Sequence, residues 1–192
     1  NDLAVCYNKK GDLHEGAIGQ AWRLNGGKRV VPAQVAGDYS KGVTLVAWVK
    51  LTDPSKPIPA LVGWQNGGTL HYTPGRESYS FGDTTKRIEN EKDELEVKNA
   101  SQPEVVTVMD DGWHLLAVSM DAKFVKIYMD GKLHQERPYH AKESLPAGSI
   151  ALASSARHPR FYIDELRVYE RPLGQDEIGR LTKLRPSPSK EQ

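Results

Sequence analysis

Three carboxylates near the middle of the chain have a spacing that could support acid–base chemistry. Glu91, Asp93 and Glu96 form an E-x-D-x-x-E arrangement inside the run KRIENEKDELEVK. Cleavage of a glycosidic bond with retention needs two carboxyl groups about 5 to 5.5 Å apart. Alternate residues of a β-strand share a face, so Glu91 and Asp93 could point together, whereas Glu96 would join them only at a β-bulge. A catalytic site therefore requires this run to be a strand that lines a cleft.

The surrounding sequence favours a solvated loop or an exposed edge strand instead. Acidic and basic residues are mixed from Lys86 to Glu104 without an apolar period, which is typical of a solvated segment. Leu95 and Val97 are the residues that could anchor such a strand to a core, and both lie on one face. We therefore predict a protein that is not an enzyme. A glycosidase or polysaccharide lyase that uses the three acids stays as an alternative.

Other residue types give no catalytic or metal-binding pattern. Cys6 is the only cysteine, which excludes an intramolecular disulfide and a cysteine-rich zinc site. The sequence has no H-E-x-x-H, no G-x-S-x-G and no glycine-rich phosphate loop. The six histidines occur singly, at His14, His71, His114, His134, His140 and His158. For His114, which follows a tryptophan in a β pattern, we expect a hydrogen-bonding role.

Bulk composition predicts one globular domain that is not built for nucleic acid. Of the 192 residues, 38% are hydrophobic and 27% charged, which excludes a disordered chain. The 26 basic and 25 acidic residues leave a formal charge of +1, so we expect neither nucleic acid nor an anionic membrane as partner. No apolar run approaches the ~20 residues of a membrane span. The start lacks a methionine and the end, RPSPSKEQ, has linker composition; we expect a domain at 1–184, a tail at 185–192 and a longer parent protein.

Turn residues at short intervals separate segments with period-2 patterning, which predicts many short strands. The best-defined pair is FVKIYM and KLHQE, because Asp130-Gly131 between them supplies the positive φ angles of a tight hairpin turn. Further strands are expected in VTLVAWVKL (43–51), ALVGW (60–64), TLHYT (69–73), SYSFGD (78–83), WHLLAVSMD (113–121), SIALAS (149–154) and FYIDELRVYER (161–171). We expect ALVGW and TLHYT to form a hairpin across QNGG.

A helix is expected near the end of the chain alone. In PLGQDEIGRLTKL, apolar residues at 173, 178, 181 and 184 fall close to helical spacing. Asp176 and Glu177 would lie in its first turn, where acids complement the helix dipole. Many strands with one short helix predict an all-β, antiparallel two-sheet sandwich.

Five motifs occur in an order that points to one family. They are GAIGQAWRLNGG, VTLVAWVKL, DGWHLLAVSMD, VKIYMDGKL and FYIDELRVYERPLGQDEIGRL. From about Gly16 to Leu181 the chain resembles the laminin-G-like, concanavalin-A-like lectin/glucanase jelly-roll family. The resemblance implies a two-sheet jelly-roll sandwich, with Trp48 and Trp113 expected in the layer between the sheets. That family includes adhesion modules, sugar-binding modules, enzymes and spacers, so the fold alone names no ligand.

Asp164 is the strongest metal-ligand candidate. An acid within the apolar strand FYIDELRVY needs a partner. The resemblance implies a structural Ca²⁺ held by Asp164 together with carbonyl oxygens of the opening loop, at Asn25 and Gly26, since oxygen ligands suit this ion. The alternatives are that Asp164 pairs with an arginine or caps a turn.

Aromatic and polar residues gather in GWQNGGTLHYTPGRESYSFGD, where the family places strands and rim loops of its concave side. Sugars are bound by exposed rings that stack on their faces and by polar groups that take their hydroxyls. The candidate ligand residues are Trp64, Gln65, His71, Tyr72, Arg76 and Tyr79, with Arg157 on a second rim turn. Alternation leaves open that Trp64 and Tyr72 belong to the core instead.

These observations predict a non-catalytic binding module of a larger exported protein, most plausibly one that recognises glycan. The expected location is extracellular, at the cell surface or periplasmic. The expected partners are a glycan or an extracellular protein, together with other domains of the parent chain. A protein–protein adhesion domain or a spacer is the alternative from a different functional class.

Overall fold

The structure is a computed structural model, and it describes residues 3–4, 13–24, 29–30, 42–55, 58–64, 68–72, 79–83, 110–121, 123–138, 150–152 and 161–184. The predicted run from Lys86 to Glu104 and the tail at 185–192 lie outside these ranges. Within them, no helix has the length and apolar character needed to cross a membrane.

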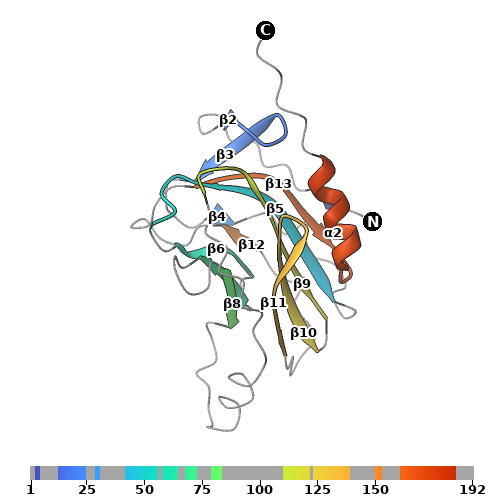
Figure 1. The fold of residues 1–192 in the computed structure, drawn as a ribbon. Coiled ribbons are helices and arrows are strands. Elements are labelled where there is room, and N and C mark those ends of the chain that lie inside the picture. Colours follow the sequence, from blue (N-terminus) through green and yellow to red (C-terminus); the bar gives the residue numbers. More distant parts are fainter. Residues whose placement is uncertain are drawn as a thin grey trace.

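Two antiparallel sheets make up the fold (Figure 1). The larger has the order β11-β10-β9-β5-β13-β3-β2, and β1 also pairs with β13. Its strands are β1 (Leu3–Ala4), β2 (Leu13–Glu15), β3 (Gln20–Leu24), β5 (Val43–Leu51), β9 (His114–Met120), β10 (Phe124–Met129), β11 (Lys132–Pro138) and β13 (Phe161–Tyr169). The smaller has the order β4-β12-β6-β7-β8. Its strands are β4 (Arg29–Val30), β6 (Ile58–Trp64), β7 (Gly68–Tyr72), β8 (Tyr79–Asp83) and β12 (Ile150–Leu152).

The predicted all-β fold with one short C-terminal helix is confirmed. β5 has the bounds that its composition indicated, and β6 pairs with β7 as the expected hairpin. Asp130 and Gly131 have φ angles of 50° and 81°, as a tight two-residue turn requires. The predicted start of β6 was too late, because the strand already includes Pro59. A register shift between Ile58 and Val62 accommodates this proline near the strand's beginning.

The central strand of the larger sheet, β5, is covered on both faces. Eight of its nine residues are buried, because alternate side chains serve two different layers. Val46 and Trp48 belong to a core cluster with Leu173 and Ile178 of the C-terminal segment, whereas Leu45 and its alternates face the other way. Figure 1 shows the helix α2 and the smaller sheet on opposite sides of the larger sheet. Trp48 is thus a core residue, but on the helix side rather than between the two sheets as expected.

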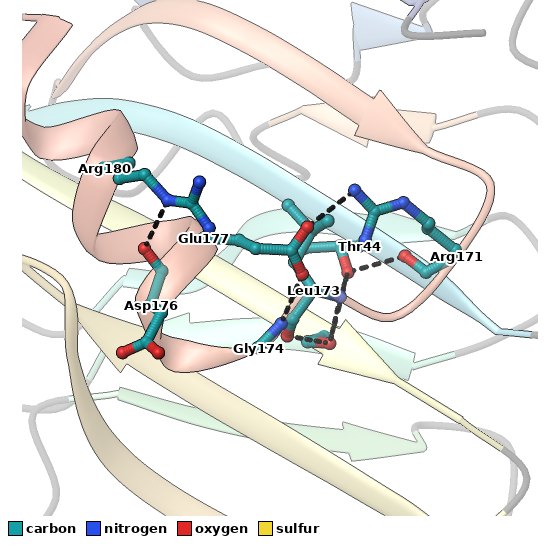
Figure 2. A network of polar contacts seen from close by, with 8 residues as sticks. Thr44, Arg171, Leu173, Gly174, Asp176, Glu177 and Arg180 are labelled. Atoms are coloured by element: carbon teal, nitrogen blue, oxygen red, sulfur yellow. Dashed lines mark hydrogen bonds and ion pairs between the residues drawn. The ribbon is translucent and has the colours of Figure 1, made fainter.

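The helix α2 (Gln175–Leu181) and the 3₁₀ turn η2 (Thr182–Leu184) follow β13 directly. Their docking depends on two buried hydroxyls (Figure 2). The Leu173 N–H donates to Oγ1 of Thr44 at 2.8 Å, and this hydroxyl donates to the Arg171 carbonyl at 2.9 Å. Ser119 donates to the Leu173 carbonyl at 3.0 Å. The network satisfies the backbone where the chain leaves the sheet, so the helix has a fixed starting point.

Candidate functional site

Asp164 holds the loop between β2 and β3 in place through a hydrogen bond. Its Oδ2 accepts the Ile18 N–H and its Oδ1 accepts the Glu165 N–H, both at 2.8 Å. A register shift after Asp164 and a φ of 49° at Glu165 mark a bulge in β13, which turns the acid inward without breaking the apolar pattern. Burial raises the pKa of Asp164, and the backbone N–H donors partly oppose that rise. The residue therefore caps a turn, one of the two alternatives to metal binding.

Glycine at position 16 makes this arrangement possible. A Cβ at Gly16 would collide with Oδ2 of Asp164 and lie 2.8 Å from the backbone nitrogen of Ala21. The loop backbone thus approaches the buried carboxylate as only glycine allows.

The described surroundings of Asp164 fit a hydrogen-bond acceptor better than a calcium ligand. Its contacts are N–H donors, whereas Ca²⁺ needs six to eight oxygen ligands. Among the described residues, no group of three His, Cys, Asp or Glu could hold a metal ion. Asn25 and Gly26 lie outside the described residues, so the calcium site stays a prediction.

The predicted ligand residues of the smaller sheet do not share one face. Tyr72 is opposite Tyr79, and their neighbours Leu70 and Phe81 are also opposite each other. By alternation these four positions share a face, whereas His71 belongs to the other one. Trp64, at the end of β6, is opposite Ile150 of β12 in the strand register, and its role stays a prediction.

The other predicted ligand residues and the three candidate catalytic acids lie outside the described residues. They are Gln65, Arg76, Arg157, Glu91, Asp93 and Glu96. Their roles stay predictions.

A different set of rings and cations lies on the larger sheet, on the face that also carries α2. In the order of adjacent strands, it consists of Trp113 immediately before β9, Lys50 on β5, Tyr162 on β13, Arg23 on β3 and His14 on β2. We call these five residues the ring–cation row. Lys50 and Arg23 are both opposite Tyr162 in the strand register, which puts the three on one face.

The rings of the row meet across the strands that carry the cations. The Trp113 and Tyr162 centroids are 6.3 Å apart with the planes inclined at 60°, and β5 with Lys50 lies between their strands. The Tyr162 and His14 centroids are 5.3 Å apart with the planes inclined at 80°, and β3 with Arg23 lies between those strands. Both pairs have the edge-to-face geometry that aromatic rings prefer. His14 is exposed and the other four side chains are half-buried, so the row forms part of the surface.

The two cations of the row lack acidic partners within the described part of the chain. Neither Lys50 nor Arg23 forms an ion pair there, and Nε of Arg23 is buried without a hydrogen-bond acceptor. Three other cations of the described part are paired: Lys126 with Glu136 at 3.4 Å, Arg167 with Glu165, and Arg171 with Glu177 at 2.7 Å. Lys132 on β11 and Arg180 on α2, like the cations of the row, form no ion pair with a described residue. Cations without acidic partners beside partly exposed rings are a combination that a polar ligand could use.

His114 forms a second polar cluster, near the turn between β10 and β11. Its Nδ1 lies 2.7 Å from Oδ2 of Asp130 and its Nε2 lies 3.0 Å from Oδ1 of Asp110. The hydrogen bond with Asp130 raises the pKa of His114 most, and burial acts against that rise. Because the two nitrogens point to opposite sides of the ring, the carboxylates do not converge on one metal position. His114 therefore ties the start of β9 to the hairpin turn, consistent with the hydrogen-bonding role expected from the sequence.

Comparison with known proteins identifies the family. A family model described as the concanavalin A-like lectin/glucanases superfamily matches residues 25–179. The chain belongs to this superfamily. The resemblance inferred from five sequence motifs is thereby confirmed. A search of curated proteins finds no match.

Solved structures with the same fold include domains of larger proteins. The receptor-binding domain of botulinum neurotoxin C/D mosaic serotype has a TM-score of 0.61 at 13% identity, over 90% of this chain and 45% of that chain. Botulinum neurotoxin type C, which depends on two ganglioside molecules to enter cells, has a TM-score of 0.63 at 14% identity, over 92% and 46%. Trypanosoma rangeli sialidase has a TM-score of 0.61 at 15% identity, over 94% and 32%. The superfamily domain thus spans less than half of each neighbour, and these identities show shared fold alone.

Sequence reasoning missed the ring–cation row, although part of its signal was visible. Lys50 is the one charged residue in the apolar run VTLVAWVKL, and alternation put it on the face of Trp48. The superfamily motifs contain Trp113 and Tyr162 as well. What the sequence could not supply is the strand order, which brings His14 and Trp113 to either side of Tyr162.

Proposed function

We propose that the protein is a non-catalytic glycan-binding module and that the ring–cation row is its binding surface. The observation that carries this proposal is the alternation of three rings with two cations across five adjacent strands. Rings provide apolar faces on which sugar rings stack, and ammonium and guanidinium groups donate to sugar hydroxyls.

The rigidity of the row supports a binding role. Its residues lie on or beside strands, and sites built on strands hold side chains more precisely than sites on loops. Trp113 also packs against the core cluster that contains Trp48. A preformed surface loses little side-chain freedom when a ligand binds, which favours affinity.

The structural neighbours support glycan as the ligand class. Botulinum neurotoxin type C interacts with gangliosides, and the ligand-binding domain of serotype D has been solved in complex with N-acetylneuraminic acid. Because this chain spans less than half of those chains, their ligands are a reason to test saccharides rather than a description of this site.

The composition of the row also supports a non-catalytic role. Acid–base hydrolysis of a glycosidic bond needs a pair of carboxyl groups, and the row contains none. We propose that the module serves a larger exported protein, in an extracellular, cell-surface or periplasmic location, where polysaccharides and glycoproteins are accessible. Other domains of the parent chain are its proposed neighbours.

Affinity electrophoresis against a panel of soluble polysaccharides tests the proposal. At least one polymer should retard the protein, and Trp113→Ala should abolish the shift because it removes a stacking surface. Trp64→Ala is the matched control, since it removes the same ring from the smaller sheet. Loss with Trp64→Ala alone would move the site to the residues first predicted from the sequence. No retardation by any polymer would overturn glycan binding and favour an adhesion or spacer domain.

A further inference from the structure

Resting on the proposed function, we propose that the ring–cation row selects anionic saccharides, in which a carboxylate or sulfate group pairs with Lys50 or Arg23. The neutral sugar faces then stack on Trp113, Tyr162 and His14. Both anionic groups are oxyanions with the same demand for N–H donors, so one surface chemistry serves either source.

Nothing on the described part of the protein balances the charges of Lys50 and Arg23. The row contains two permanent cations and no acid, and Asp164, which the register puts on the same face, is 7% exposed with both oxygens bonded to backbone N–H groups. Arg167 and Arg171, by contrast, are each held by a glutamate. With a formal charge of +1 for the whole chain, this local excess does not follow from overall composition. It is a property of the row.

Arg23 is the second cation of the row, and its side chain is half-buried. Its Nε is enclosed by the protein without a hydrogen-bond acceptor, so a ligand can meet only the part of the guanidinium that stays at the surface. A guanidinium presents its N–H groups as a planar fork that matches the two oxygens of a carboxylate or sulfate. An oxyanion that meets the exposed part of Arg23 would therefore balance its charge, whereas a sugar hydroxyl would not.

The spacing of the row suits an extended ligand. β5 and β3 lie on either side of β13, so the backbones that carry Lys50 and Arg23 are about 10 Å apart. Tyr162 lies between them and contacts a ring on each side. A saccharide crossing the strands would meet ring, cation, ring, cation and ring in turn. That order suits a saccharide chain whose apolar sugar faces stack on the rings and whose anionic substituents pair with the cations.

Direct binding to three polymers tests the proposal: polygalacturonate, which is carboxylated, dextran sulfate, which is sulfated, and dextran, which is neutral. Affinity electrophoresis at about 0.15 M salt, where distant surface charges are screened, should show retardation by at least one anionic polymer and none by dextran. Arg23→Gln and Lys50→Gln should each weaken binding about tenfold, the scale of one lost charge-assisted hydrogen bond. Lys123→Gln is the control, because it removes one exposed cation from the turn between β9 and β10, at the far end of the sheet.

Each result decides between defined outcomes. A preference for one anionic polymer that falls in both row variants but not in the control supports the proposal and identifies the anionic group. Retardation by dextran that is unchanged in Arg23→Gln and Lys50→Gln would overturn charge selection while leaving glycan binding intact. An equal loss in all three variants would show general attraction to polyanions and would also overturn it. No binding to any of these or to the wider panel would overturn the proposed function itself. Thermal unfolding of each variant verifies that it is folded.

Discussion

The two ends of the helix-bearing face of the larger sheet treat polar groups in opposite ways. Where α2 docks, polar groups find partners: Thr44 and Ser119 bond the backbone around Leu173, and Arg171 binds Glu177. In the ring–cation row, Lys50 and Arg23 have no such partners among the described residues. The same sheet supplies both surfaces. This difference supports our proposal that one end of the face is organised for stability and the other for a ligand.

Stability and glycan binding should therefore respond to different variants. Variants in the docking region should lower the free energy of unfolding and leave glycan binding unchanged. Lys50→Gln and Arg23→Gln should keep the free energy of unfolding and weaken glycan binding.

Asp164→Ala should destabilise the protein most, by roughly 2–4 kcal/mol, because two backbone N–H groups lose their acceptor in a buried site. Denaturant unfolding measures the change. Asp164→Asn should cost less, since its amide oxygen keeps one acceptor. Equal stability of wild type and Asp164→Ala would refute the loop-capping role.

The same variant tests the predicted calcium site. We expect the cap to stabilise the loop with or without metal, so the Asp164→Ala deficit should persist in chelator. If calcium raises the unfolding midpoint of the wild type and not that of Asp164→Ala, the metal site implied by the family resemblance is present as well.

Thr44→Val should cost about 1–3 kcal/mol, because it removes the hydroxyl shared by Leu173 and Arg171 while keeping the side chain's shape. The variant should still bind glycan. Simultaneous loss of binding would show that the two ends of the face are coupled and would contradict their separate roles.

His114 should make stability depend on pH. Its folded pKa is raised above 6.5, chiefly by the hydrogen bond with Asp130, so its contribution is complete below pH ~6.5 and declines as the pH rises through the folded pKa. The difference in unfolding midpoint between wild type and His114→Gln should therefore be larger at pH 5.5 than at pH 9. A difference in unfolding midpoint that grows with pH would contradict a stabilising role for the hydrogen bonds of His114 with Asp110 and Asp130.

Glu177→Gln should have the smallest effect. The carboxylate is exposed, and Arg171 lowers its pKa to about 2, with help from the Gly174 N–H. Its contribution should be complete above pH ~4.5 and disappear as the pH falls through about 2. The thermal midpoints of the variant and of wild type, compared at pH 6 and pH 2.5, measure this contribution. A loss of stability larger than that of Thr44→Val would show that the helix depends on the Glu177 carboxylate in its first turn.

The fold could be predicted from the sequence because its signals are local. Strand β5, the Asp130-Gly131 turn and the helix after Leu173 follow from alternation, turn chemistry and helical spacing. The ring–cation row could not be predicted, because its residues come from five strands whose order is non-local. The role of Asp164 could be predicted only in part. Its need for a partner was visible in an apolar strand, but the bulge that turns it toward Ile18 was not.

The most direct test of the account measures unfolding and binding together on Thr44→Val and Lys50→Gln. We predict that Thr44→Val loses stability and keeps its retardation by the preferred polymer. Lys50→Gln should keep its stability and lose most of that retardation. If both variants lose binding only in proportion to lost stability, the ring–cation row is not the binding surface, and the central claim is wrong.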